Sequence, residues 1–218
     1  MFLEPFPPHS RKRLQNKINA TSIDVHSLEH VADAWLAERR RPESSSNKFS
    51  KRWTALGTSE SLNLSRNLFL SSSTDEYWAL GPDWHEAKWV DQYEAFDVVL
   101  QQLESDGDFQ STLRVHPNLL NKSIRFIKGE TQRIKWLQDR HPTLRVIGPR
   151  ESVNTYELID AAERIFVSIS TAGLEASAQG KPVWCVMSTN YDLVADVRSL
   201  HKRADVNSHV LAPWKVDP

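Results

Sequence analysis

The sequence contains very little cysteine and no long apolar run. Cys185 is the one cysteine in 218 residues. A disulfide within the chain is therefore excluded, and we interpret Cys185 as a small buried apolar residue. No stretch of eighteen apolar residues occurs, which predicts that no helix spans a membrane. Pro5, Pro7 and Pro8 stand where a signal peptide would have its apolar core. We therefore expect a cytoplasmic protein.

Glycine is also scarce, which argues against several nucleotide-binding motifs. The seven glycines form neither GxGxxG nor GxxxxGK followed by Ser or Thr, so a nicotinamide-dependent dehydrogenase and a P-loop NTPase are disfavoured. The GxSxG elbow of many hydrolases is absent as well. Residues 26–30 read HSLEH and match the H-x-x-E-H spelling of some zinc enzymes. No third ligand is evident, and we expect neither a metal nor a cofactor.

The net charge of −1 conceals an uneven distribution along the chain. Residues 1–53 contain ten Lys/Arg and six Asp/Glu, whereas residues 54–218 are net negative. Without an overall positive field, we expect no binding to nucleic acid. We interpret residues 1–53 as a basic N-terminal extension, irregular over 1–22 and helical over 26–40, that ends in a polar linker. Residues 54–218 are expected to form a separate domain.

Three basic clusters in this extension have two interpretations. They lie at residues 11–13, 39–41 and 51–52. The simpler interpretation is solvated surface. The alternative is contact with anionic lipid or a charged acceptor, which would place the protein peripherally at the inner membrane.

Short apolar segments alternate with helical segments from about residue 66 onward. We expect strands over 67–73, 111–117, 143–149, 164–170 and 182–187, and helices over 86–104, 120–140, 155–162 and 170–180. Asn154 and Glu157 resemble a capping box, and Gly180 followed by Pro182 marks a helix end. Such alternation predicts the α/β class, with a Rossmann-like parallel sheet and helices on both of its faces.

Polar side chains follow three of the expected strands. Ser71–Thr74 follow the first strand, His116 ends the second, and Ser168–Thr171 end the fourth. In a sheet of order 3-2-1-4-5, these ends meet where the strand order reverses, which is where open parallel sheets bind ligands. We therefore expect a crevice lined by Ser72, Ser73, His116, Ser170 and Thr171.

The expected crevice suits a phosphate group. A helix beginning at Ser170 or Thr171 would direct free N–H groups and a partial positive charge into it. Gly173, which has no side chain, would allow the phosphate to approach the backbone closely. His116 would donate to a phosphate oxygen and stabilise a departing nucleotide. Glu175, one turn into the helix, would accept from ribose hydroxyls.

Each of these residues also has a structural interpretation. Ser170 or Thr171 could be a plain N-cap, and His116 could be bound to a neighbouring loop. Glu175 could be a first-turn carboxylate that stabilises the helix dipole. The serine run could be an ordinary loop that leads into a helix. The joint placement of these residues favours the binding interpretation.

The acidic, Trp-rich segment after the first strand is less informative. No catalytic base stands out, and Asp75 and Glu76 are the nearest carboxylates to the expected crevice. Trp78, Trp84 and Trp89 cluster there as well. We interpret these tryptophans as core residues. A surface that stacks against a sugar or an acceptor is the alternative.

Several segments resemble a known family. RVHPNLLNKS at 114–123, the run from Val146 to Val183, and Asn190-Tyr191 resemble bacterial capsule-polysaccharide biosynthesis proteins. The segment LFLSSSTDEYWALGPDW at 68–84 is similar to the opening of the same half-domain. The family comprises GT-B glycosyltransferases and includes the capsule Kdo transferases. The resemblance covers about residues 66–192.

The resemblance implies a nucleotide-sugar donor. In this family, and in bacterial sialyltransferases that use CMP-sugars, the His-Pro and Ser-Ser/Thr motifs contact the nucleotide phosphate. His116, Ser170 and Thr171 would inherit that role, which favours a CMP-linked donor and a polysaccharide or glycolipid acceptor. CDP-glycerol glycerophosphotransferases have a similar arrangement, and nucleotide-sugar epimerases share the GLEA…GKPV pattern.

A GT-B enzyme has two Rossmann-like halves, and residues 1–65 are too short to be one of them. The resemblance therefore implies the donor-binding C-terminal half of a transferase. A partner chain could supply the acceptor half. Alternatively, the chain is a non-catalytic or truncated nucleotide-binding subunit, or a fragment similar to a glycerophosphotransferase or an epimerase.

Overall fold

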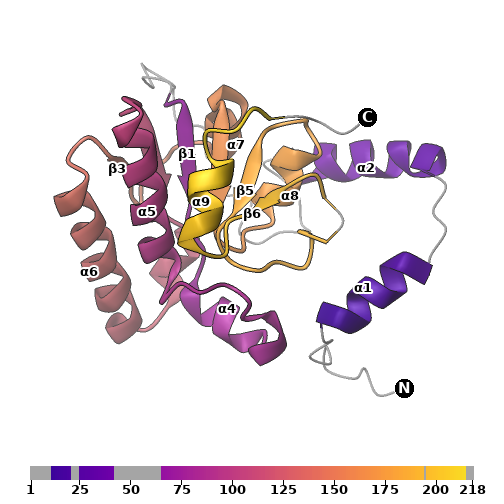
Figure 1. Cartoon of the computed structure of the whole chain (residues 1–218), viewed down its shortest axis with the longest axis horizontal. Coiled ribbons are helices and arrows are strands. Elements are labelled where there is room, and N and C mark those ends of the chain that lie inside the picture. Colours follow the sequence, from indigo (N-terminus) through magenta and orange to yellow (C-terminus); the bar gives the residue numbers. More distant parts are fainter. Residues whose placement is uncertain (1–10, 21–24, 42–64, 194, 215–218) are drawn as a thin grey trace.

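The computed structural model describes residues 11–20, 25–41, 65–193 and 195–214. Six parallel strands form one sheet in the order β3-β2-β1-β4-β5-β6 (Figure 1). They are β1 (Asn67–Leu70), β2 (Ser111–Arg114), β3 (Arg145–Ile147), β4 (Arg164–Val167), β5 (Val183–Cys185) and β6 (Arg198–Ser199). The expected fold class and the order 3-2-1-4-5 are confirmed. The strand β6 was not predicted.

Helices cover both faces of the sheet because the strands alternate between two apolar cores. Around the strands lie α4 (Thr74–Ala79), α5 (Gln92–Ser105), α6 (Ile124–Arg140), α7 (Thr155–Ala161), α8 (Ala172–Ser177) and α9 (Arg203–His209), with short 3-10 helices η1 (Pro82–Trp84) and η2 (Pro117–Asn121). Phe69 of β1 lies in a core with residues of α5, α6 and α9. Leu68 and Leu70 lie in the other core, with residues of α7 and α8. Strands buried on both faces are typical of parallel sheets.

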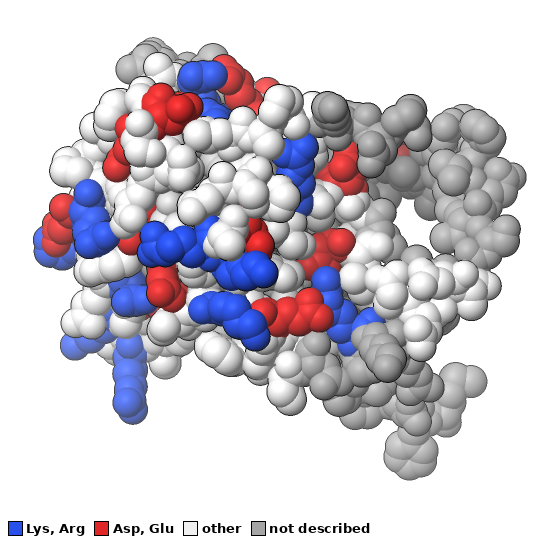
Figure 2. Space-filling view, viewed as in Figure 1, with Lys and Arg blue, Asp and Glu red and all other residues white. Residues whose placement is uncertain are grey.

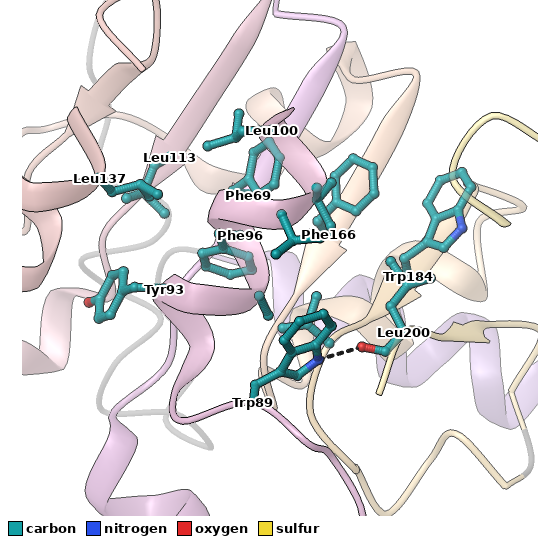
Figure 3. Close-up of a cluster of buried hydrophobic side chains, with 14 of the residues drawn as sticks. Phe69, Trp89, Tyr93, Phe96, Leu100, Leu113, Leu137, Phe166, Trp184 and Leu200 are labelled. Atoms are coloured by element: carbon teal, nitrogen blue, oxygen red, sulfur yellow. Dashed lines mark hydrogen bonds between the residues drawn. The ribbon is translucent and has the colours of Figure 1, made fainter. Parts of the chain in front are cut away.

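Aromatic rings dominate the core beneath α5 and α9 (Figure 3). Phe166 stacks on Phe69 at a centroid distance of 4.8 Å and on Trp184 at 5.1 Å. The indole of Trp89 donates to the carbonyl oxygen of Leu200 at 2.7 Å. Trp84 and Trp89 are buried, as the core interpretation predicts, whereas Trp78 is 52% exposed.

Local capping explains where the observed helices differ from the predicted ones. The helix predicted from residue 86 begins at Gln92, because the Asp91 carboxylate accepts from the N–H groups of Tyr93 and Glu94. Likewise, Ser123 caps α6 and accepts from the N–H of Phe126. The helix predicted over 170–180 is shorter, since α8 has six residues. Neither α4 nor α9 was predicted.

The N-terminal extension contains two helices, α1 (Arg11–Ala20) and α2 (Val25–Arg40). Both contact residues 65–214, the sheet with its surrounding helices, which we call the sheet unit. Figure 1 shows α2 lying beside α8. The prediction of a helix over 26–40 is confirmed, whereas irregular structure over residues 11–20 is wrong. The polar linker and the boundary between residues 53 and 54 lie outside the described residues.

The interpretation of the basic clusters as solvated surface is wrong for two arginines. Arg11 pairs with Asp192 at 2.6 Å, and Arg39 pairs with Glu175 at 2.7 Å. Both guanidinium groups are largely buried, with side-chain exposures of 13% and 20%. The chain's own carboxylates therefore compensate these charges. Residues 51–52 lie outside the described part of the chain.

Surface charges of both signs intermingle on the face shown in Figure 2. That distribution agrees with the balanced net charge and presents no single-sign field on this face. No helix among the described residues is long and apolar enough to cross a membrane.

Candidate functional site

The carboxyl ends of β1, β2 and β4 meet in the middle of the sheet, as the strand order requires. Serine hydroxyls connect them. The Ser71 hydroxyl accepts from the N–H of His116 at 3.0 Å, which joins the ends of β1 and β2. The Ser72 hydroxyl accepts from the N–H of Ile169 at 3.2 Å, which joins the ends of β1 and β4. The predicted convergence of these strand ends is therefore confirmed.

Ser73 differs from its two neighbours. Its hydroxyl is buried and has no hydrogen-bond partner among the described residues. Ser73 also lines a narrow hollow together with His116, Tyr93 and Glu130. A buried hydroxyl without a partner is unfavourable unless something else satisfies it. Ser73 is thus the serine of this run with unused hydrogen-bonding capacity.

His116 sits at the start of η2 and acts as its cap. Its Nδ1 accepts from the N–H of Asn118 at 3.1 Å. Burial, together with the positive charges of Arg114 and Lys122, lowers the pKa of His116 to about 4. At neutral pH the ring is uncharged, and this bond assigns its proton to Nε2. His116 is therefore suited to donate one hydrogen bond to an anion.

The hydroxyls after β4 have partners within the protein. Ser170 Oγ accepts from the N–H of Ala172 at 3.3 Å, in agreement with a capping role. Thr171 Oγ1 accepts from Nη2 of Arg39 at 3.0 Å and lies on the exposed side of the turn. Because α8 is only six residues long, its dipole is a weaker source of positive potential than the predicted helix would have been.

Gly173 and Glu175 have packing and hydrogen-bond partners within the protein that the sequence did not reveal. A Cβ on Gly173 would lie 2.5 Å from the Tyr191 hydroxyl and 2.9 Å from a methyl group of Val167. The missing side chain therefore makes room for Tyr191. Glu175 is 1% exposed. Its carboxylate accepts from Arg39 at 2.7 and 2.9 Å and from Tyr156 at 2.7 Å. A contact with ribose stays a prediction and would require one partner to yield.

Asp75 and Glu76 lie in the first turn of α4, and one lysine is ion-paired with both. Lys122 Nζ lies 2.8 Å from Asp75 and 3.4 Å from Glu76. Both carboxylates are about half exposed. Glu76 also accepts from the side-chain amide of Asn118 at 3.3 Å. A role for either residue as a catalytic base stays a prediction.

Glu130 of α6 is a buried carboxylate that the sequence analysis missed. It accepts from Thr74 Oγ1 at 2.9 Å and from the Tyr93 hydroxyl at 2.7 Å. Burial raises its pKa, while these two hydrogen bonds oppose the rise. Glu130, Ile134 and Leu137 are the buried residues of α6, spaced as one helical face. That spacing was the signal that could have identified it.

Gln92 and Glu130 together hold the loop of residues 71–74 in place. The Gln92 amide accepts from the N–H of Ser72 at 2.9 Å and donates to its carbonyl at 2.8 Å. It also approaches Thr74 Oγ1 at 3.3 Å. The site is therefore pre-organised by buried polar groups. Among the described residues, no group of three or more His, Cys, Asp or Glu side chains could hold a metal ion.

Comparison with known proteins supports the fold. No protein family matches the sequence, and no curated protein matches it. Among solved structures, the chain is similar to KpsC of Thermosulfurimonas dismutans, a beta Kdo 2,4 transferase, with 18% identity and a TM-score of 0.52. The match covers 91% of this chain and 61% of that one.

A second match is the KpsC beta Kdo 2,7 transferase of the same organism, with 16% identity and a TM-score of 0.49. It covers 90% of this chain and 55% of the transferase. The chain thus spans about three fifths of the length of the structures it matches. At these identities the similarity concerns the fold. The resemblance to capsule Kdo transferases that the sequence motifs indicate is confirmed at that level.

Proposed function

We propose that this chain binds a nucleotide-activated sugar, with CMP as the nucleotide, and forms the donor-binding part of a glycosyltransferase. The acceptor would be a surface polysaccharide or glycolipid, and transfer would take place in the cytoplasm or at the inner membrane surface. The observation that supports this proposal is that Ser73 and His116 line one hollow at the strand-order reversal of the sheet. Ser170–Thr171 follow β4, whose end is joined to β1 by the bond from Ile169 to Ser72. The likeness in fold to a Kdo transferase agrees with the proposal.

The chemistry follows from what these groups offer. When the glycosidic bond to the nucleotide breaks, negative charge accumulates on the leaving phosphate. A neutral imidazole with its proton on Nε2, together with the nearby hydroxyls, would donate to that phosphate and lower the barrier. The buried bonds of Gln92 and Glu130 hold the serine loop in position beforehand, so little reorganisation is needed during the reaction.

A nucleotide titration with a matched histidine pair tests this proposal. Calorimetry with CMP, CDP, UDP and GDP should show selective binding of CMP. His116→Asn keeps an acceptor for the N–H of Asn118 but removes the donor on Nε2. It should weaken CMP binding about tenfold or more, as expected for a hydrogen bond to a charged group. His209→Ala, at an exposed histidine in α9, is the control and should bind normally.

Other results would redirect the assignment. Unchanged CMP affinity in His116→Asn and His116→Ala would remove His116 from the site. Preference for CDP would favour a glycerophosphotransferase-like activity. Binding without sugar transfer would favour the alternative of a nucleotide-binding subunit. That alternative is motivated by the missing acceptor half, since the chain covers 61% of the transferase structure it resembles.

A further inference from the structure

Arg39 brings a positive charge from the N-terminal extension to the end of β4. It lies in the last turn of α2, whereas its partners Thr171 and Glu175 lie more than 130 positions further along the chain. Figure 1 shows α2 meeting the sheet unit beside α8. The guanidinium reaches the Thr171 hydroxyl at 3.0 Å, so it lies at one of the two residues that we assign to the nucleotide phosphate.

Other cations near the crevice are already engaged. Lys122 is paired with both Asp75 and Glu76. The Arg114 side chain is buried and donates to the carbonyl oxygens of Gly148 and Glu151. A phosphate ester is anionic and is bound most strongly by a cation with a matching geometry, which a guanidinium has.

Glu175 binds the Nε–Nη2 edge of the Arg39 guanidinium. Its Oε1 accepts from both Nε and Nη2, and its Oε2 lies 2.7 Å from the Tyr156 hydroxyl. Nη1 of Arg39 makes no hydrogen bond to the described residues. A guanidinium has five N–H donors in a rigid fork, so Arg39 retains donors for a ligand while Glu175 holds it in place.

We propose that Arg39 is a phosphate ligand of the nucleotide site, with Nη1 donating to a phosphate oxygen beside Thr171. Glu175 then acts as the positioning residue for Arg39. This inference rests on the proposed function. If Arg39 binds the phosphate, the end of α2 lines the donor site, and the buried Glu175 carboxylate serves to orient the Arg39 guanidinium. The opposite hypothesis is that the Arg39 side chain fills the nucleotide site and competes with the nucleotide for it.

The experiment compares CMP with cytidine, which lacks the phosphate. Calorimetry on the full chain gives the ratio of the cytidine and CMP dissociation constants for each variant. Because Arg39→Met alone would strand the buried Glu175 carboxylate, the main variant is the double Arg39→Met, Glu175→Gln. Its ratio should fall about tenfold or more relative to Glu175→Gln alone, with cytidine affinity unchanged. Thermal unfolding checks that both variants are folded.

Arg40 provides the matched control. It lies in the same turn of α2 and is also ion-paired, but it donates to Asp160 and Gln179 and not to Thr171. Its guanidinium also lies over the ring of Tyr156. Arg40→Met should leave the ratio unchanged. An unchanged or higher CMP affinity in the double variant would overturn the role of Arg39 and leave the proposed function standing. Failure of the unsubstituted chain to bind any nucleotide would overturn both.

Discussion

At the scale of single residues, Ser71, Ser72 and Ser73 are neighbours with different partners. The first two hydroxyls accept buried N–H groups of His116 and Ile169, whereas the Ser73 hydroxyl has no partner among the described residues. Removing an acceptor from a buried N–H costs about 1–3 kcal/mol. Ser71→Ala and Ser72→Ala should each destabilise the protein by that amount in urea unfolding.

Ser73→Ala should leave the free energy of unfolding within about 0.5 kcal/mol of the original value, because no hydrogen bond is lost. It should instead weaken CMP binding in the titration described above. A large loss of stability in Ser73→Ala, with CMP affinity intact, would assign the hydroxyl to the fold and exclude it from the site.

The lowered pKa of His116 predicts a loss of stability on acidification. The pKa falls from 6.5 to about 4 in the folded chain. As pH falls, the unfolded state therefore binds a proton first. Stability is complete above about pH 6.5 and is lost as pH falls towards 4, by at most about 3 kcal/mol. Urea unfolding at pH 7 and pH 4.5 should show this loss.

His116→Asn has no titrating ring and should lose less stability between these two pH values. His201 also has a lowered pKa, caused mainly by burial, and its contribution remains in both proteins. The difference between the two proteins isolates His116. Identical pH profiles would show that His116 is more accessible to solvent in solution than in this structure.

At the scale of elements, α8 packs against Tyr191 without space for a side chain at residue 173. A methyl group there would meet the Tyr191 hydroxyl at 2.5 Å. Gly173→Ala should therefore cost about 1–3 kcal/mol of unfolding free energy. In a Tyr191→Phe background the closest obstacle is gone. The cost of Gly173→Ala should then be at least about 0.5 kcal/mol smaller. Equal costs in the two backgrounds would place the strain elsewhere.

Sequence patterns predicted the elements whose positions depend on local rules. Alternating apolar runs predicted strands β1 to β5 and their parallel arrangement. The ends of β1 and β2 identified Ser73 and His116, which line one hollow. The first residue of α5 depends on the Asp91 side chain, and the sequence pattern placed the start of this helix six residues too early, at residue 86 instead of Gln92. Helix α4 is too short for periodicity to reveal it.

Long-range pairing explains most of what the sequence did not reveal. The partners of Arg39 and Arg11 lie 136 and 181 residues away in the chain. A run of arginines at a helix end is indistinguishable, in one sequence, from a solvated C-terminal turn. Glu130 was missed for a related reason. Its spacing from Ile134 and Leu137 indicated the buried face of α6, but the sequence could not reveal its partners, Thr74 and Tyr93.

At the scale of the whole molecule, the candidate site is assembled from segments far apart in the sequence. Four segments meet at the carboxyl ends of the central strands. They are the end of α2, the loop of residues 71–74, the start of η2 and the turn before α8. By contrast, α9 packs with α5 against the core on one face of the sheet (Figure 1).

Binding of CMP should protect those four segments together from hydrogen exchange. At a hundredfold excess over the dissociation constant, a ligand stabilises the folded state by about 2.7 kcal/mol. Hydrogen exchange through local opening should slow most in the segments that contact the ligand. Mass spectrometry should therefore show protection at residues 37–41, 71–76, 115–119 and 168–175, with a smaller change in α9. Protection centred on Arg11 and Asp192 would move the site to the ends of β5 and β6. Protection confined to 71–76 and 115–119 would leave α2 outside the site and separate the nucleotide-binding role of the sheet from the role inferred for Arg39.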